Sequence, residues 1–67
     1  MARVIRIYAD EVAAGDYIVL NTDRGRRVYH VCEVGVNGRT VTIVFNAQGG
    51  FVRKHYDADE RIKVREE

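Results

Sequence analysis

The sequence has no serine, proline or tryptophan, and its only cysteine is Cys32. Without serine there is no serine nucleophile, and one cysteine cannot form a disulfide within the chain. The lack of proline, together with six glycines and abundant valine, is typical of strands that are joined by tight turns. We therefore expect a reduced chain that folds into β-strands.

Long apolar runs are also missing. No segment approaches the ~20 apolar residues needed to cross a membrane, and arginines interrupt the apolar stretch near the N-terminus. The 67 residues are 46% hydrophobic, which is too apolar for a disordered chain and enough for one small core. We expect a single domain over residues 1–67, located in the cytoplasm and without a membrane partner.

The strongest local signal is the pair Asn37-Gly38, which lies between two runs rich in β-branched residues. Asn-Gly favours a two-residue type I′ turn, because both residues tolerate positive φ. A turn at this pair would set the register of a hairpin. In that register Val34 would lie opposite Val41, and Cys32 opposite Ile43. A strand over 26–36 would be about twice the usual length, so we expect it to bend at Gly35 or at a β-bulge.

This register divides the hairpin into two faces. The inner face would be mostly apolar and would hold Val28, His30, Cys32, Val34, Val41, Ile43, Phe45 and Ala47. The outer face would carry an apolar group of three residues, namely Tyr29, Val31 and Val44. Because exposed apolar groups often mark partner surfaces, the outer face is a candidate interface.

Four more segments have the composition of short strands: 3–8, 17–20, 51–56 and 61–65. The segment ADEVAAG between the first two indicates a loop or one helical turn, and DADE at 57–60 indicates a tight turn. We predict an all-β fold, specifically a small SH3-like antiparallel β-barrel of five to six short strands, because closure removes exposed strand edges.

The stretch YADEVAAGDYIVL, the Asn-Gly hairpin and the terminal YDADERIKV together resemble a type of small open reading frame found in actinobacterial phages. The resemblance covers most of the chain, and its motifs are turn signals rather than catalytic signatures. It implies a phage or prophage origin and therefore the cytoplasm of a host cell. It implies no reaction.

Two groups of side chains could carry chemistry, and for both the sequence favours a structural role. One is the turn that contains His55, Asp57, Asp59 and Glu60, whose spacing matches no closed zinc site and no calcium loop. The other is the pair Cys32 and His30, which we expect inside the core, where burial makes a thiol inert. We predict a protein with no enzymatic activity, cofactor, metal site or small-molecule substrate.

These observations leave two kinds of binding module. In the first, the outer face of the central hairpin binds a host protein, or a second copy of the chain as a homodimer, through Tyr29, Val31, Val44, Arg27 and Arg53. In the second, the chain binds nucleic acid weakly, with Tyr29 stacking on a base and these cations on phosphate: Arg24, Arg26, Arg27, Arg53 and Lys54. The pI of 7.9 lies below the value of about 9 that is usual for nucleic-acid-binding domains, so the first is favoured.

Overall fold

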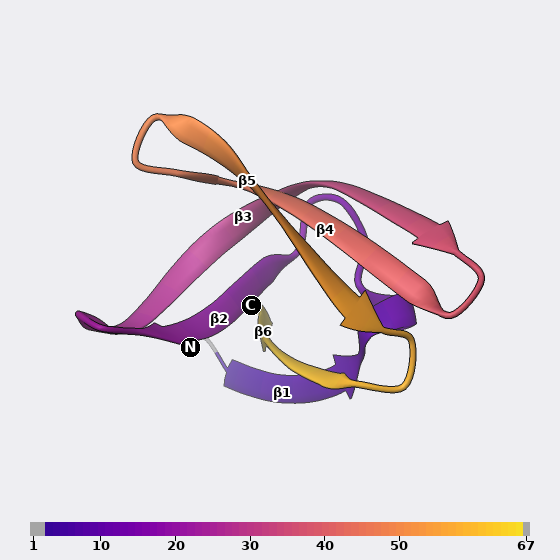
Figure 1. The fold of residues 1–67 in the computed structure, drawn as a ribbon. Coiled ribbons are helices and arrows are strands. Elements are labelled where there is room, and N and C mark those ends of the chain that lie inside the picture. Colours follow the sequence, from indigo (N-terminus) through magenta and orange to yellow (C-terminus); the bar gives the residue numbers. More distant parts are fainter. Residues whose placement is uncertain (1–2, 67) are drawn as a thin grey trace.

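The computed structural model describes residues 3–66, which form six antiparallel strands and one short helix (Figure 1). The elements are, in chain order, β1 (Arg3–Tyr8), the 3₁₀ helix η1 (Ala9–Glu11), β2 (Tyr17–Thr22), β3 (Gly25–Asn37), β4 (Thr40–Ala47), β5 (Gly50–Asp57) and β6 (Arg61–Glu66). The prediction of an all-β fold of five to six antiparallel strands is confirmed, whereas the predicted closed SH3-like barrel is not. Within these residues no helix is long and apolar enough to cross a membrane.

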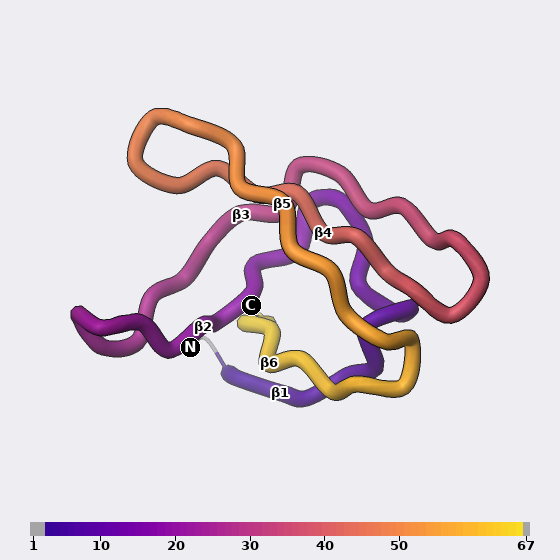
Figure 2. Tube along the Cα trace, viewed as in Figure 1, coloured from indigo at the N-terminus to yellow at the C-terminus, as the bar shows by residue number. Residues whose placement is uncertain are grey.

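The strands form one sheet in the spatial order β1-β6-β2-β3-β4-β5. Its two edge strands, β1 and β5, do not pair with each other among the described residues, so the sheet is not closed. The long strand β3 pairs with β2 along its first half and with β4 along its second half. Figure 1 and Figure 2 show the resulting bend, with β4 and β5 folded across from β1 and β6.

The β3–β4 turn lies one residue later than the sequence predicts. Asn37 pairs with Thr40, so the two turn residues are Gly38 and Arg39. Gly38 has a φ of 62°, which suits the first turn position, where a type II′ turn requires glycine. The register therefore shifts by two residues and pairs Val34 with Ile43. A shift of two keeps every side chain on its face, so Val41, Ile43 and Phe45 are buried as predicted.

A β-bulge at Cys32 changes the faces of β3. Val31 pairs with Phe45 and Glu33 with Val44, which leaves Cys32 without a partner on β4. One extra residue inverts the alternation of side chains on either side of it. Beyond the bulge Val34 packs against the core as predicted, but before the bulge Tyr29 and Val31 turn inward instead.

Several predicted positions on β3 are therefore wrong. Val31 is fully buried rather than part of an outer surface, and Tyr29 packs against the core. The residues expected inside the core before and at the bulge are exposed, namely Val28, His30 and Cys32. The physical reason is the bulge, which adds one residue to β3 and not to β4.

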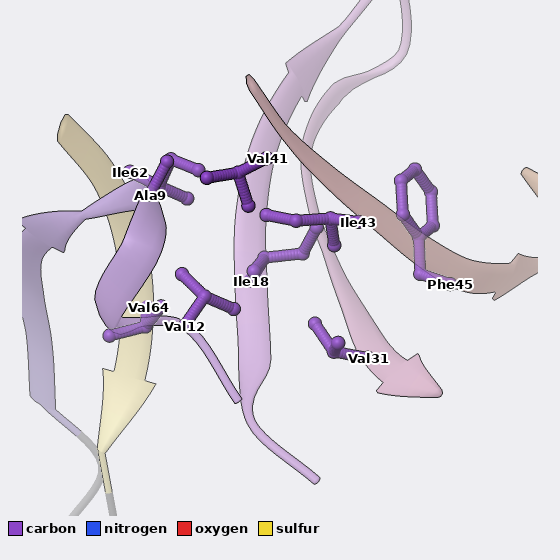
Figure 3. Close-up of a cluster of buried hydrophobic side chains, with 9 residues drawn as sticks. All are labelled: Ala9, Val12, Ile18, Val31, Val41, Ile43, Phe45, Ile62 and Val64. Carbon is purple, nitrogen blue, oxygen red and sulfur yellow. The ribbon is translucent and has the colours of Figure 1, made fainter. Parts of the chain in front are cut away.

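The core lies between the two halves of the bent sheet (Figure 3). Its buried residues come from η1, the loop after it, β2, β3, β4 and β6: Ala9, Val12, Ile18, Val31, Val41, Ile43, Phe45, Ile62 and Val64. The η1 segment enters this core, because the Ala9 N–H donates a 2.8 Å hydrogen bond to the carbonyl of Glu60 and holds the segment against the start of β6. Val52 and Tyr56 of β5 pack on the core edge.

Val31 joins the two halves through both its backbone and its side chain. Its N–H donates to the carbonyl of Asp16 at 2.8 Å, and its own carbonyl accepts from the N–H of Gly15 at 2.9 Å. On the other side Val31 pairs with Phe45. Its side chain has no exposed surface.

Val31→Glu should therefore unfold the protein, because an unpaired carboxylate in the core costs several kcal/mol, comparable to the stability of a small domain. The matched control is Cys32→Glu, the same change at the next residue, which should change stability by less than about 1 kcal/mol at an exposed site. Urea unfolding followed by circular dichroism measures both. Equal destabilisation by the two variants would contradict the placement of the bulge.

Burial raises the pKa of Tyr56 above its ordinary value of 10.0, and the nearby Glu60 carboxylate raises it further. The unfolded chain therefore releases this proton at a lower pH than the folded protein does. The contribution to stability is complete below pH 10 and is lost as the pH rises through the raised pKa. Tyr56→Phe should flatten the fall in stability above pH 10, measured by urea unfolding at several pH values. Tyr8→Phe, at an exposed position, is the control.

Candidate functional site

Strands β1 and β6 carry four of their five cations on the side that faces away from the core; the fifth, Arg3, lies on the other side, where it forms an ion pair with Glu66. In β6 the sequence RIKVR alternates, so Ile62 and Val64 enter the core while Arg61, Lys63 and Arg65 point outward. Antiparallel pairing with β1 adds three more outward residues to the same side. The pairs are Val4 with Arg65, Arg6 with Lys63, and Tyr8 with Arg61.

Strands β2 and β3 continue this surface. Tyr17 pairs with Arg65 on one side and with His30 on the other, which makes a row of four side chains across four strands: Val4, Arg65, Tyr17 and His30. Beyond this row β2 and β3 pair Val19 with Val28 and Asn21 with Arg26 on the same side. We call the twelve residues the outer cationic face; Val19 is buried beneath its neighbours, with 5% exposure, and the other eleven are exposed or half-buried. The twelve are Val4, Arg6, Tyr8, Tyr17, Val19, Asn21, Arg26, Val28, His30, Arg61, Lys63 and Arg65.

The outer cationic face concentrates positive charge in a nearly neutral protein. It holds five lysines and arginines and none of the acidic residues that the structure describes, a charge of +5. The rest of the chain holds six lysines and arginines and ten acidic residues, a charge of −4, which together give the net charge of +1. The acidic residues lie in η1, in the turns, on the other half of the sheet and at the C-terminal end.

Aromatic rings lie among these cations. The guanidinium carbon of Arg65 lies 5.1 Å from the centre of the Tyr17 ring, and that of Arg61 lies 5.4 Å from the centre of the Tyr8 ring. The His30 ring contacts the Tyr17 ring in an edge arrangement at 5.1 Å between centres. Contacts of this kind attract each guanidinium to the face of its ring.

Apolar side chains on this face also reach solvent. Val4, Tyr8 and Val28 are each 40–43% exposed. A surface with cations, aromatic rings and exposed apolar groups can bind a ligand that has both negative charge and flat apolar parts.

The cations that the sequence predicted as a nucleic-acid site do not form one patch. Arg26 belongs to the outer cationic face, but its neighbour Arg27 points to the opposite side of β3. Arg27 and Arg24 instead line a hollow of about 270 Å³ at the β2–β3 turn, where Asp23 adds a negative charge. On β5, Arg53 and Lys54 point to opposite sides as well.

Tyr29 also lines the hollow at the β2–β3 turn. Its ring packs on the Phe45 ring, with 4.8 Å between the centres and a tilt of 38°. Tyr29 is only partly exposed, since it packs against the core. One side of this ring is therefore already occupied, which weakens the predicted role of Tyr29 as a stacking platform for a base.

The outer side of the other half of the sheet forms a second surface. A hollow of about 510 Å³ lies there, and we call it the Phe51 hollow after its most exposed residue; it is lined by Cys32, Glu33, Gly35, Thr42, Val44, Phe51 and Arg53. The Phe51 side chain is 73% exposed, the highest value among the large hydrophobic residues. Of the five predicted interface residues, Val44 and Arg53 lie here, whereas Tyr29, Val31 and Arg27 do not.

The acidic segment 57–60 forms the turn between β5 and β6, and its side chains make turn contacts. The Glu60 carboxylate accepts a 3.0 Å hydrogen bond from the Asp57 N–H, and Asp59 lies 3.6 Å from the guanidinium of Arg39 in an exposed ion pair. The His55 ring nitrogen Nδ1 is 2.9 Å from the Thr42 hydroxyl. Among the described residues there is no group of three or more histidine, cysteine or acidic side chains that could hold a metal ion.

Sequence reasoning missed four of the five cations on the outer cationic face: Arg6, Arg61, Lys63 and Arg65. When charge is averaged by segment, the two ends of the chain are acidic, which conceals these cations. The sequence nevertheless contains this information, because strict alternation in RIKVR places three cations on one side of the strand and two apolar residues on the other. Counting charge by strand face rather than by segment would have found them.

Comparison of the chain with protein-family models, with curated proteins and with solved structures finds no match.

Proposed function

We propose that this protein is a non-catalytic nucleic-acid-binding module and that the outer cationic face is its binding surface. One observation carries the proposal, namely a charge of +5 on one side of the sheet against −4 for the rest of the chain. A polyanion approaching this side meets five cations. Among residues 3–66, the carboxylates that line hollows beside the face are Asp10 and Asp59 near Tyr8, and Asp16 and Glu66 near Tyr17 and Arg65. A pI of 7.9 does not argue against this, because binding depends on local charge rather than on the average.

The strength of the interaction follows from the number of cations. If all five contact phosphates, the slope of log K against log salt concentration is roughly −3.5 to −4.5. Such a protein binds tightly at low salt and weakly at physiological salt. We therefore expect a module that acts beside other binding surfaces, on the same chain or on a partner, rather than a tight binder by itself.

Neighbouring arginines on β3 provide a matched test, because Arg26 lies on the outer cationic face and Arg27 on the opposite side. Arg26→Ala should weaken binding to a fluorescein-labelled oligonucleotide and reduce the salt slope by about 1, whereas Arg27→Ala should change neither. The double variant Arg6→Ala/Lys63→Ala should reduce the slope by about 2, with Arg24→Ala/Arg39→Ala as its control. Fluorescence anisotropy at several salt concentrations measures each slope.

Two results would overturn the proposal. One is the absence of binding to any oligonucleotide at low salt by the folded wild-type protein. The other is equal weakening by the test and control variants, which would mean that binding follows total charge and not this face. Circular dichroism of each variant confirms that it remains folded.

A second candidate function is self-association through the Phe51 hollow, favoured by the 73% exposure of Phe51. Glu33 and Arg53 flank Val44 on its two sides, on β3 and β5. Two copies packed face to face about a twofold axis along β4 would set each Glu33 against the other copy's Arg53, and would lay each Phe51 ring across the other copy's β3. The surface is small, so we expect a weak homodimer.

Reversing the charge of Arg53 or of Glu33 tests this dimer. Arg53→Glu alone and Glu33→Arg alone should each abolish self-association in sedimentation-velocity experiments, because like charges then face each other. An equimolar mixture of the two variants should restore a dimer, since opposite charges face each other again. Wild-type protein that remains monomeric at millimolar concentration, or a mixture without rescue, would rule the dimer out. Phe51→Ala should weaken the wild-type dimer.

We further propose that the fold is a relative of small SH3-like barrels and that the chain has a phage or prophage origin. The first is supported by six short, strongly bent antiparallel strands around one core. The second is supported by the resemblance of its turn segments to small phage reading frames, and it would place the protein in the cytoplasm of the host cell.

A further inference from the structure

We infer that the outer cationic face binds single-stranded nucleic acid in preference to duplex, with bases stacked on its guanidinium planes and rings. This inference rests on the proposed function and specifies its ligand. It is carried by three features of the face: its width, its rings and its exposed apolar side chains.

The width of the face is unsuited to a duplex groove. The row from Val4 to His30 crosses four paired strands. At about 4.8 Å between strands the backbones alone span roughly 14 Å, whereas the DNA major groove is about 12 Å wide and admits a helix or a two-stranded ribbon. The only helix within residues 3–66 is η1, which is three residues long and buries Ala9 in the core.

The rings and guanidinium planes provide stacking surfaces that a duplex would not use. Arg65 lies over the Tyr17 ring and Arg61 over the Tyr8 ring, and the Tyr8 and His30 rings are exposed to solvent. Unpaired bases stack on arginine planes and on aromatic rings, and this stacking tolerates any base sequence. In a duplex the bases already stack on each other and present only their edges.

The exposed apolar side chains favour the same ligand. Val4 and Val28 lie on the outer cationic face and are 42% and 40% exposed. Contact with the charged backbone of a duplex would desolvate phosphates without burying much apolar surface. Contact with unpaired bases would bury the apolar surface of the two valines together with the flat apolar surface of the bases.

The β2–β3 hairpin offers the main alternative, because it is a two-stranded ribbon with arginines at its tip (Figure 1). A ribbon of this kind fits a major groove. Binding by this route would depend on Arg24 and Arg27, which line the hollow at that turn and do not lie on the outer cationic face. Variants that remove Arg24 and Arg27, compared with variants that remove cations of the outer cationic face, therefore distinguish binding by the hairpin tip from binding by the face.

The test compares three probes of equal length: a thymidine 20-mer and an abasic deoxyribose-phosphate 20-mer, which carry the same charge, and a 20-base-pair DNA duplex, which carries about twice as much. At 150 mM salt we expect the thymidine strand to bind at least tenfold more tightly than the duplex, counted per site. We also expect it to bind at least fivefold more tightly than the abasic strand, which has the same phosphates and no bases to stack.

Tyrosine fluorescence gives an independent readout, because the chain has four tyrosines and no tryptophan. Stacking of thymine near Tyr8 and Tyr17 should quench tyrosine emission, and the abasic strand should not. The quench should shrink in Tyr8→Phe and in Tyr17→Phe, which keep the stacking surface and remove the fluorophore. Tyr56→Phe is the control, because Tyr56 lies at the edge of the core on the other half of the sheet.

Each outcome is decisive. Tighter binding of the thymidine strand, dependent on bases and on Arg26, supports the inference. Duplex binding that is as tight or tighter, and still lost in Arg6→Ala/Lys63→Ala, overturns the inference but keeps the proposed function. Duplex binding that is lost in Arg24→Ala/Arg27→Ala overturns the role of the face. No binding of any probe at low salt overturns the proposed function itself.

Discussion

The single unpaired residue at Cys32 is the constraint on which the rest of the structure depends. One extra position in β3, with none in β4, inverts the direction of every side chain on one side of the bulge relative to the other. Val31 therefore enters the core, where its backbone bonds to residues 15–16 and its pairing with Phe45 connect the two halves of the sheet. Without the bulge, a strand of thirteen residues would have to place either Val31 or Val34 on the solvent side.

The bulge also determines which surfaces the protein presents. Because Tyr29 and Val31 turn inward, the alternate residues Arg26, Val28 and His30 turn outward and extend the cations of β1 and β6 into one face. On the other half of the sheet, Glu33 and Val44 point outward beside Phe51. The two sides differ in charge and in apolar exposure, so a net charge of +1 conceals a strong separation within a chain of 67 residues.

Much of the fold followed from local patterns. Turn residues and β-branched runs located all six strands, and alternation in RIKVR and in TVTIVF identified Ile62, Val64, Val41, Ile43 and Phe45 as core residues. The faces of the first half of β3 could not be predicted, because HVCEV has no glycine or other local mark that shows where the extra residue lies. The candidate site was missed for a different reason, since its cations come from three strands, β1, β3 and β6, which are separated in the sequence and come together only through the pairing of the sheet.

The sequence by itself determined the β class, the strand segments, the approximate positions of the turns and the lack of a serine nucleophile or an internal disulfide, because each depends on residues that are neighbours along the chain. Tertiary structure alone decided three things: the turn position at Gly38, the bulge at Cys32 and the gathering of five cations on one face. These depend on which register buries the most apolar surface across the whole sheet. The buried apolar surface depends on contacts between strands that are distant in the sequence, so no single segment determines it.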